Sequence, residues 1–382
     1  MKVLNVNMTL GAVSGGGTGE RTLQMSRFLK RGGAECAILT LDIGRDSRSP
    51  DALPGIPVTA LRCVLPRFYI FALPEPRVTE LVRWADVIHV MNHWTLLNAV
   101  VYRAARQAGR PYVVCSAGAL QVYGRSSLAK QLYNRVVGNR IIRNAAACVA
   151  IAGSEIDLFR QYGVANDRIE LIPNGVDPDA FRAADPAAFR KKFGVGDAPF
   201  VLFLGRLNPI KGPDLLLQAF GRIQGSFGDL HLVFAGPDEG MLGPLQNMAR
   251  QANISGRVHF IGPVSGLDRA SAYSATQLLV IPSRREAMSI VVLEAGICGT
   301  PVLITDQCGF DEVGRIGGGR VVGASPDALE SGLIGMLKDP EPLRAMGLKL
   351  KDHVVRHFLW ESTARKYLEL FERILKAKRE EP

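Results

Sequence analysis

The chain has 382 residues, a formal net charge of +10 and a sequence pI near 9.5. Its 47% hydrophobic and 21% charged residues are typical of a soluble globular protein long enough for two or three domains. No apolar run approaches the roughly 18 residues of a membrane-spanning helix, and the opening MKVLNVNM predicts a strand instead of a signal peptide.

Cysteine spacing and charge narrow the range of partners. The six cysteines lie far apart and form no C-x-x-C pair, which predicts a reducing, cytoplasmic compartment and no structural metal. The positive charge calls for an anionic partner such as a phosphate-bearing substrate, an anionic bilayer or nucleic acid. Because neither an RNA-binding strand motif nor a zinc finger is visible, we expect no nucleic acid.

Short runs rich in β-branched residues alternate with helical patterns, as expected of parallel sheets wrapped by helices. The predicted strands are 3–8, 35–41, 86–91, 111–115 and 147–152 in the first half, and 200–205, 230–236, 257–262, 278–283 and 301–306 in the second. Between them, LIPNGVDPDAF at 171–181 combines several turn signals and is the predicted hinge. We therefore expect two doubly wound α/β domains that face one another across a ligand-binding cleft.

A glycine-rich turn, SGGGTGE, follows the first predicted strand. Its glycines, Gly15, Gly16, Gly17 and Gly19, are predicted to precede an amphipathic helix whose N-terminus carries partial positive charge. Backbone N–H groups in such a turn can approach a phosphate or sugar oxygen closely. The spacing fits neither a P-loop nor a dinucleotide-binding G-x-G-x-x-G, so a plain strand-to-helix turn is the alternative.

Two basic segments of the first half also carry apolar and aromatic residues. Residues 124–145 predict an amphipathic helix in which Arg125, Lys130 and further arginines interleave with leucine, valine and isoleucine. Residues 61–74 add aromatic residues and two arginines. Such a surface suits anionic lipid headgroups. An ordinary core-facing helix with solvated arginines is the alternative.

The second series opens with FVLFLGRLNPIKG (200–212), which places two cations near the end of a strand. Arg206 follows the strand directly, and Lys211 comes at the start of the next predicted helix. A guanidinium, an ammonium and helix amides in this arrangement could together bind a diphosphate. Two solvated loop charges are the alternative.

The stretch PSRREAMSIVVLEAGICGTPVLITD (282–306) carries two glutamates in an apolar, glycine-rich run. Glu286 is predicted at the start of a helix, where the dipole favours a carboxylate and the N–H groups of residues 287–289 point outward. Glu294 lies about two turns further along, on a face expected in the core. Because a buried carboxylate without partners costs several kcal/mol, we expect Glu294 to accept hydrogen bonds from ligand hydroxyls. The alternatives are a helix cap for Glu286 and a salt bridge for Glu294.

In this order, the motifs resemble those of the retaining glycosyltransferases of family 4 (group 1), which share the GT-B architecture. The resemblance runs nearly end to end and rests on these stretches: the turn Gly15–Gly17, DVIHVMNHW (86–94), SEIDLF (154–159), IPNGVD (172–177), GRLNPIKG (205–212), the E-x₇-E stretch from Glu286, and FLWESTARKYLELFE (358–372). It implies an N-terminal Rossmann-like acceptor-binding domain (1–173), a Rossmann-like donor-binding domain (174–357) and a C-terminal helix (358–382) that crosses back to the first domain.

The resemblance also implies roles for individual residues. Arg206 and Lys211 would neutralise the diphosphate of a nucleotide-sugar donor in place of a metal, so neither a metal nor another cofactor is expected. Glu294 would bind the ribose hydroxyls, and Glu286 would hold the transferred sugar. The other implied donor contacts are Gly16 and Gly17 from the opposite domain, Gly262 and Val264 at the base, and the backbone of Ala287, Met288, Ser289 and Ile290 at the sugar.

Two departures from the family pattern affect the expected active site. Where a histidine usually follows the strand PYVVC, this chain has Ala117, so His93 in MNHWTLLN is the candidate for a catalytic cleft histidine. Met288 and Ser289 stand where many members carry an aromatic residue and a glycine, which leaves the sugar open.

The implied reaction moves a hexose from a UDP- or GDP-sugar to a hydroxyl of a glycan or lipid-linked saccharide, with retention at the anomeric carbon. The expected setting is polysaccharide or lipopolysaccharide assembly in the cytoplasm, peripheral on the inner face of the cell membrane if residues 61–74 and 124–145 bind lipid. A nucleotide-sugar epimerase and a non-catalytic nucleotide-sugar-binding protein of the same fold are the alternatives.

Overall fold

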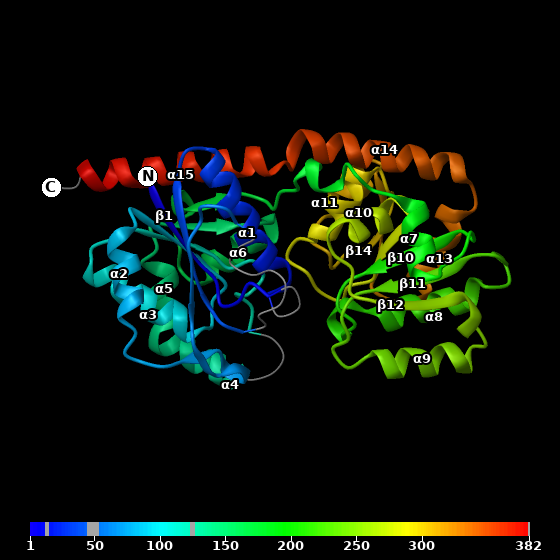
Figure 1. Cartoon of the computed structure of the whole chain (residues 1–382), viewed down its shortest axis with the longest axis horizontal. Coiled ribbons are helices and arrows are strands. Elements are labelled where there is room, and N and C mark those ends of the chain that lie inside the picture. Colours follow the sequence, from blue (N-terminus) through cyan, green and yellow to red (C-terminus); the bar gives the residue numbers. More distant parts are fainter. Residues whose placement is uncertain (12–14, 44–52, 123–126, 381–382) are drawn as a thin grey trace. The chain divides into compact units, whose positions relative to one another are not determined.

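The computed structural model describes residues 1–11, 15–43, 53–122 and 127–380, and the chain divides into two compact units. Unit 1 joins Met1–Gly175 to the C-terminal segment Trp360–Pro382, and unit 2 is Val176–Leu359. In both units helices cover a parallel sheet (Figure 1).

Unit 1 is built on a parallel sheet. Its described residues contain seven sheet strands in the order β3-β2-β1-β6-β7-β8-β9, and every neighbouring pair is parallel. The strands are β1 (Lys2–Val6), β2 (Glu35–Leu41), β3 (Val58–Leu61), β6 (Val87–Met91), β7 (Tyr112–Cys115), β8 (Ala147–Ala150) and β9 (Ile169–Leu171). A separate antiparallel pair follows β3, namely β4 (Cys63–Leu65) and β5 (Ile70–Phe71).

The helices of unit 1 flank this sheet. They are α1 (Gly16–Arg31), α2 (Pro76–Trp84), α3 (Leu96–Gln107), α4 (Ser127–Tyr133), α5 (Asn139–Arg143), α6 (Gly153–Gln161) and α15 (Trp360–Glu380), and a π-helical turn, Asn134–Gly138, joins α4 to α5. The red C-terminal helix α15 packs beside the blue α1 (Figure 1). The prediction that Gly16, Gly17 and Gly19 precede the helix is wrong. Because α1 begins at Gly16, these three glycines belong to its first turn.

Unit 2 repeats the architecture without the same sequence. Its sheet has the strand order β12-β11-β10-β13-β14-β15, again all parallel. The strands are β10 (Phe200–Leu204), β11 (His231–Ala235), β12 (Val258–Gly262), β13 (Leu278–Ile281), β14 (Val302–Thr305) and β15 (Gly319–Val322). The helices are α7 (Pro186–Phe193), α8 (Pro213–Ile223), α9 (Leu242–Gln251), α10 (Gly266–Ala275), α11 (Ile290–Cys298), α12 (Glu312–Arg315), α13 (Pro326–Leu337) and α14 (Pro340–His357).

The central strands are apolar because helices cover both of their faces. Every residue of β6, β7, β8, β13 and β14 is buried, and each of these strands is a short run rich in Val, Ile, Leu or Ala. Each sheet has its own apolar core. The prediction of two doubly wound α/β domains is therefore confirmed, and loops at the carboxyl ends of the strands are where a ligand site is expected.

Candidate active site

Two loops of unit 2 bring Lys211 and Glu286 into contact. Lys211 ends the 3₁₀ turn Pro209–Lys211 that follows β10, and Glu286 lies in the loop that follows β13. Because β10 pairs with β13, with Leu202 opposite Leu279, the carboxyl ends of both strands deliver their loops to the same edge of the sheet. Nζ of Lys211 lies 3.0 Å from Oε1 of Glu286, and the Glu286 side chain is only 9% exposed.

Gly212 allows these loops to approach so closely. It has a left-handed backbone (φ +66°), and a Cβ at this position would lie 2.1 Å from the carbonyl oxygen of Pro282. The neighbouring N–H of Arg284 donates to the carbonyl of Ile210 at 2.8 Å. A side chain at residue 212 would therefore separate the two loops that place Lys211 and Glu286.

Glu286 is fixed by its own loop and by the loop after β14, and not by the start of a helix. Ser283 Oγ donates to Oε1 of Glu286 at 2.5 Å, and the Glu286 N–H donates to the Gln307 carbonyl at 2.7 Å. The predicted position at the helix start is wrong, since α11 begins at Ile290. The Ser289 N–H is also not free, because it donates to the Cys308 carbonyl at 3.3 Å.

Glu294 is buried on α11, 5% exposed, and has protein partners. Tyr273 OH donates to Oε2 at 2.7 Å, and NH1 of Arg269 lies 3.1 Å from Oε1. Both partners come from α10. The argument that a buried carboxylate here needs ligand hydroxyls is therefore wrong, because the salt bridge considered as the alternative is present. The ribose-binding role implied by the family resemblance stays a prediction.

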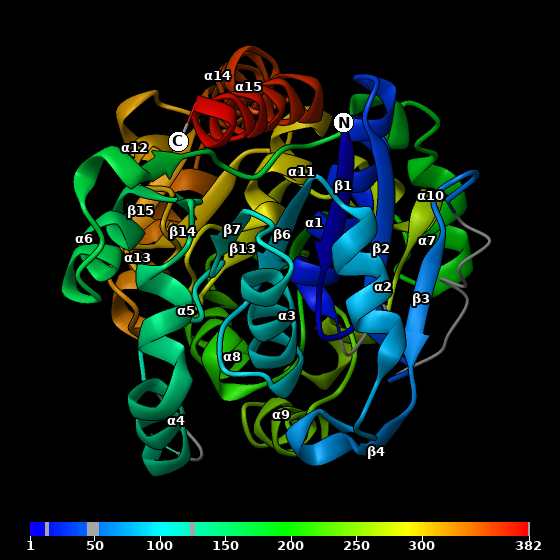
Figure 2. The same cartoon turned by 90° about the vertical axis from the view of Figure 1, so that its left-hand side faces the viewer.

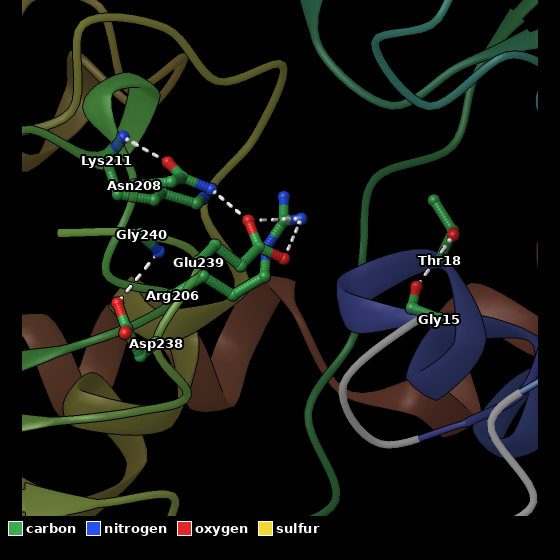
Figure 3. Close-up of polar contacts among 8 residues, drawn as sticks. All are labelled: Gly15, Thr18, Arg206, Asn208, Lys211, Asp238, Glu239 and Gly240. Carbon is green, nitrogen blue, oxygen red and sulfur yellow. Dashed lines mark hydrogen bonds and ion pairs between the residues drawn. The ribbon is translucent and has the colours of Figure 1, made fainter. Parts of the chain in front are cut away.

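Arg206 is linked to Lys211 through two intermediate side chains (Figure 3). NH1 of Arg206 lies 3.0 and 3.3 Å from the two carboxylate oxygens of Glu239, which follows β11. Asn208 Nδ2 donates to the same carboxylate at 2.6 Å, and Asn208 Oδ1 accepts the backbone N–H of Lys211 at 3.0 Å. Neither Asn208 nor Glu239 was predicted, because each looks like an ordinary polar residue of a turn in the sequence.

The other predicted donor contacts lie in four loops or helix starts. Gly262 ends β12 with a left-handed backbone (φ +73°), and Val264 is half-buried in the loop after it. Met288 and Ser289 are buried beside the half-buried Ala287, and Ile290 opens α11. In unit 1, Gly16 and Gly17 start α1. Their roles as donor contacts stay predictions.

His93 is buried in an aromatic cluster of unit 1. It is 1% exposed, its Nε2 lies 2.8 Å from Oδ1 of Asn134, and its ring meets those of Tyr133 and Tyr162 edge-on at 5.6 and 5.7 Å. Burial lowers the pKa of His93 to about 4, although the Asn134 contact acts in the opposite direction. The neutral ring therefore anchors the π-helical turn that contains Asn134. A part for His93 in catalysis stays a prediction that none of these contacts supports.

Ala117, where many family members have histidine, lies in a strained loop after β7. Its φ is +46°, and the next residue, Gly118, also has a positive φ. The buried carboxylate of Glu155 holds this loop, since it accepts hydrogen bonds from Ser116 Oγ at 2.9 Å and from the Gly118 N–H at 2.7 Å. Glu155 lies in the SEIDLF stretch of the family resemblance but was given no role, although an acid in the first turn of a helix after a buried strand is a usable signal.

Two family profiles match this chain, one in each unit. The profile of the glycosyl transferases group 1 matches residues 185–352, and that of the glycosyl transferase 4-like domain matches residues 16–175. Together the two matches cover most of the sequence and include Arg206, Lys211 and both glutamates of the E-x₇-E stretch.

Named relatives and a solved structure agree with these profiles. The D-inositol 3-phosphate glycosyltransferase 2 of Catenulispora acidiphila is 30% identical over 305 residues, which cover 75% of this chain and 70% of the relative. The D-inositol 3-phosphate glycosyltransferase of Xylanimonas cellulosilytica is 29% identical over 393 residues, covering 94% and 92%. Anabaena HepE, solved with UDP and glucose, shares the GT-B fold with a TM-score of 0.79 at 19% identity, covering 98% of this chain and 100% of that one. The chain therefore belongs to the group 1 glycosyltransferases.

Proposed function

We propose that this enzyme transfers a hexose from a UDP- or GDP-sugar to a hydroxyl of a glycan or lipid-linked saccharide, with retention at the anomeric carbon and without a metal. The observation that carries the proposal is the contact of Lys211 with Glu286, to which Arg206 is linked through Asn208 and Glu239. The proposed nucleotide-sugar site thus has two cations, Arg206 and Lys211, after β10 and an acid, Glu286, after the neighbouring strand β13.

The chemistry follows from the charge that develops in the reaction. As the bond between the anomeric carbon and the diphosphate oxygen breaks, negative charge grows on the departing diphosphate. Fixed cations stabilise that charge without reorganising, as a metal ion would. In the proposed complex Lys211 and Arg206 bind the diphosphate, and Glu286 accepts hydrogen bonds from sugar hydroxyls. Retention requires the acceptor oxygen to bond to the anomeric carbon on the face that the diphosphate leaves, while the proton of the acceptor hydroxyl passes to the departing diphosphate oxygen.

The similar proteins guide the choice of substrates. HepE was solved with UDP and glucose, which favours a uridine nucleotide here, and the relatives named above act on D-inositol 3-phosphate by name. A phosphate-bearing or lipid-linked acceptor would also suit the net charge of +10.

Labelled nucleotide sugars test the proposal against its alternatives. We expect UDP- or GDP-hexose to release free nucleotide when a saccharide, a polyprenyl-linked saccharide or D-inositol 3-phosphate is supplied, and the rate to persist with EDTA. Nuclear magnetic resonance of the product should show the anomeric configuration of the donor. Conversion of the donor sugar without transfer would identify an epimerase, and binding without turnover would identify a sensor.

We also propose that one end of unit 1 binds an anionic membrane surface on the cytoplasmic side. The exposed apolar residues belong to two segments that reach this end, and Figure 2 shows α4 and β4 at opposite corners of the bottom of unit 1. We name them the apolar tip, and they are Val64, Leu65, Phe68, Leu73, Leu128, Leu132 and Val136. Among the helices of the described ranges, none is long and apolar enough to span a membrane.

The helical part of the apolar tip has the spacing of a single face. Leu128, Leu132 and Val136 follow one another at intervals of four residues and are 79%, 62% and 61% exposed. Further along, Ile141 and Ile142 are buried in the core, so the core-facing alternative holds only for the C-terminal part of this segment. Arg135 is exposed on the same helical segment, whereas Arg125 lies outside the described residues. An apolar face flanked by basic residues is typical of interfacial helices.

Vesicle binding tests the apolar tip. Replacing Leu128 and Leu132 together by glutamate should reduce cosedimentation with phosphatidylglycerol vesicles by about tenfold or more, because two leucines leave the interface and two like charges face the lipid. The matched control is Leu348→Glu, an exposed leucine of α14 in unit 2 (65% exposed), which should bind as the wild type does. Equal binding of the double variant, or no binding of the wild type, would contradict the proposal.

A further inference from the structure

We infer that Glu239 is a positioning residue that sets the geometry of both diphosphate-binding cations, Arg206 directly and Lys211 through Asn208. The inference rests on the proposed function, in which these cations bind the donor diphosphate. It adds a residue outside the GRLNPIKG and E-x₇-E motifs, placed by the loop after β11 in the same unit (Figure 3).

One carboxylate holds two side chains at once. Oε1 of Glu239 accepts from Arg206 NH1 at 3.0 Å, and Oε2 accepts from Asn208 Nδ2 at 2.6 Å. Since the Asn208 amide nitrogen is thereby directed to Glu239, its oxygen is directed to the backbone N–H of Lys211, 3.0 Å away. Asn208 thus caps the 3₁₀ turn that carries Lys211. Loss of Glu239 would release both the guanidinium and the orientation of this cap.

The loop that presents Glu239 is itself rigidly held. The backbone N–H of Glu239 donates to the Leu207 carbonyl at 3.1 Å, and the Leu207 N–H donates to the Pro237 carbonyl at 2.9 Å. Gly236 (φ +150°) lets the two loops touch, because a Cβ there would lie 1.8 Å from the carbonyl oxygen of Gly205. The loop bearing Glu239 is therefore joined to the loop bearing Arg206 along its length.

Asp238 fixes the other side of the same loop. Its Oδ1 accepts the N–H groups of Gly240, Met241 and Leu242 at 2.8, 2.9 and 3.0 Å. These backbone hydrogen bonds lower the pKa of Asp238, and the bond from Leu242 has the largest effect. The carboxylate is therefore ionised at neutral pH. The acid before Glu239 thus ties the loop to the start of α9, and Glu239 is left to serve the cations.

An acid beside a diphosphate site needs a reason, since it repels the ligand. Stability does not supply one, because the side chains of Arg206 and Glu239 are 42% and 32% exposed and such pairs contribute little. Among the described residues, both contacts of Arg206 with Glu239 use NH1, so the rest of the guanidinium can still face a phosphate. We therefore infer that Glu239 stands beside the site because it orients the guanidinium of Arg206 toward the diphosphate.

Binding measurements on Glu239 variants test the inference. Calorimetric titration of the wild type with UDP, GDP and ADP first selects the nucleotide that binds. Glu239→Ala should then weaken that diphosphate about tenfold, a typical cost of losing the partner of a binding group, and weaken the matching monophosphate less. The isosteric Glu239→Gln should fall in between, because its single acceptor oxygen can serve only Arg206 or Asn208. The melting curve without ligand should not move.

The control is Glu330→Gln, which removes a similarly exposed acid (30% exposed) from its pair with Arg222 in the same unit and should leave nucleotide binding unchanged. Unchanged or tighter diphosphate binding in Glu239→Ala would overturn the inference, since Glu239 would then be a bystander or a competitor of the ligand. If the wild type binds none of the three nucleotides, the proposed function fails first and takes this inference with it.

Discussion

Replacing Lys211 by methionine is expected to lower the rate of glycosyl transfer by about 10² to 10³-fold, the usual cost of removing one preorganised charge-stabilising group. The ammonium lies 3.0 Å from Glu286 and is 24% exposed, so it is held in place before any donor arrives. In the proposed mechanism its charge acts on the departing diphosphate, which becomes more negative in the transition state than in the bound donor. We therefore expect kcat to fall more than the donor KM rises.

Steady-state rates with a saturating nucleotide sugar measure this effect. Lys192→Met is the matched control, because Lys192 forms an exposed pair with Asp268 at 2.7 Å in the same unit. Circular dichroism must show that the variant is folded, as Glu286 loses its cation. A kcat for Lys211→Met within about threefold of the wild type would exclude Lys211 from the transition state, because such a ratio corresponds to less than 1 kcal/mol.

Central strands and the edge strand β12 could be predicted from the sequence, whereas the other edge strands could not. Strands such as β6 and β14 are buried on both faces and therefore form unbroken apolar runs. The edge strands β3, β9 and β15 are three or four residues long and only partly buried, so neither a run nor an alternation marks them. Pairing with a neighbour defines them, and that information lies elsewhere in the chain.

The same division holds for the candidate site. Contact between the Lys211 and Glu286 loops could be anticipated because both follow adjacent parallel strands. The partners of Glu294 could not, since Tyr273 and Arg269 come from another helix and meet it only through the packing of α10 on α11. Glu239 was missed for a related reason: the sequence PDEG predicts a turn but does not show which loop that turn will touch.

Arg21→Met is expected to destabilise unit 1 by about 3 to 5 kcal/mol, because it removes three hydrogen bonds that a buried, charged guanidinium donates. Arg21 is 1% exposed on α1, and its guanidinium donates to Asn174 Oδ1, to the Ile172 carbonyl at 3.4 Å and to Tyr367 OH at 2.8 Å. The Arg21 side chain thus ties α1 to Ile172 and Asn174, near the end of the first segment of unit 1, and also to the C-terminal helix α15.

Tryptophan fluorescence isolates this effect, since Trp84, Trp94 and Trp360 all belong to unit 1. Arg21 also lies over the Trp360 ring at 5.7 Å, so the emission should change with the loss of the cation as well as with unfolding. Urea unfolding followed at these tryptophans should shift to lower denaturant in Arg21→Met. Arg31→Met, an exposed change on the same helix, should stay within about 0.5 kcal/mol of the wild type. If Arg21→Met and Arg31→Met unfold at the same urea concentration, apolar packing holds α15 to α1, and the buried guanidinium contributes little to the stability of unit 1.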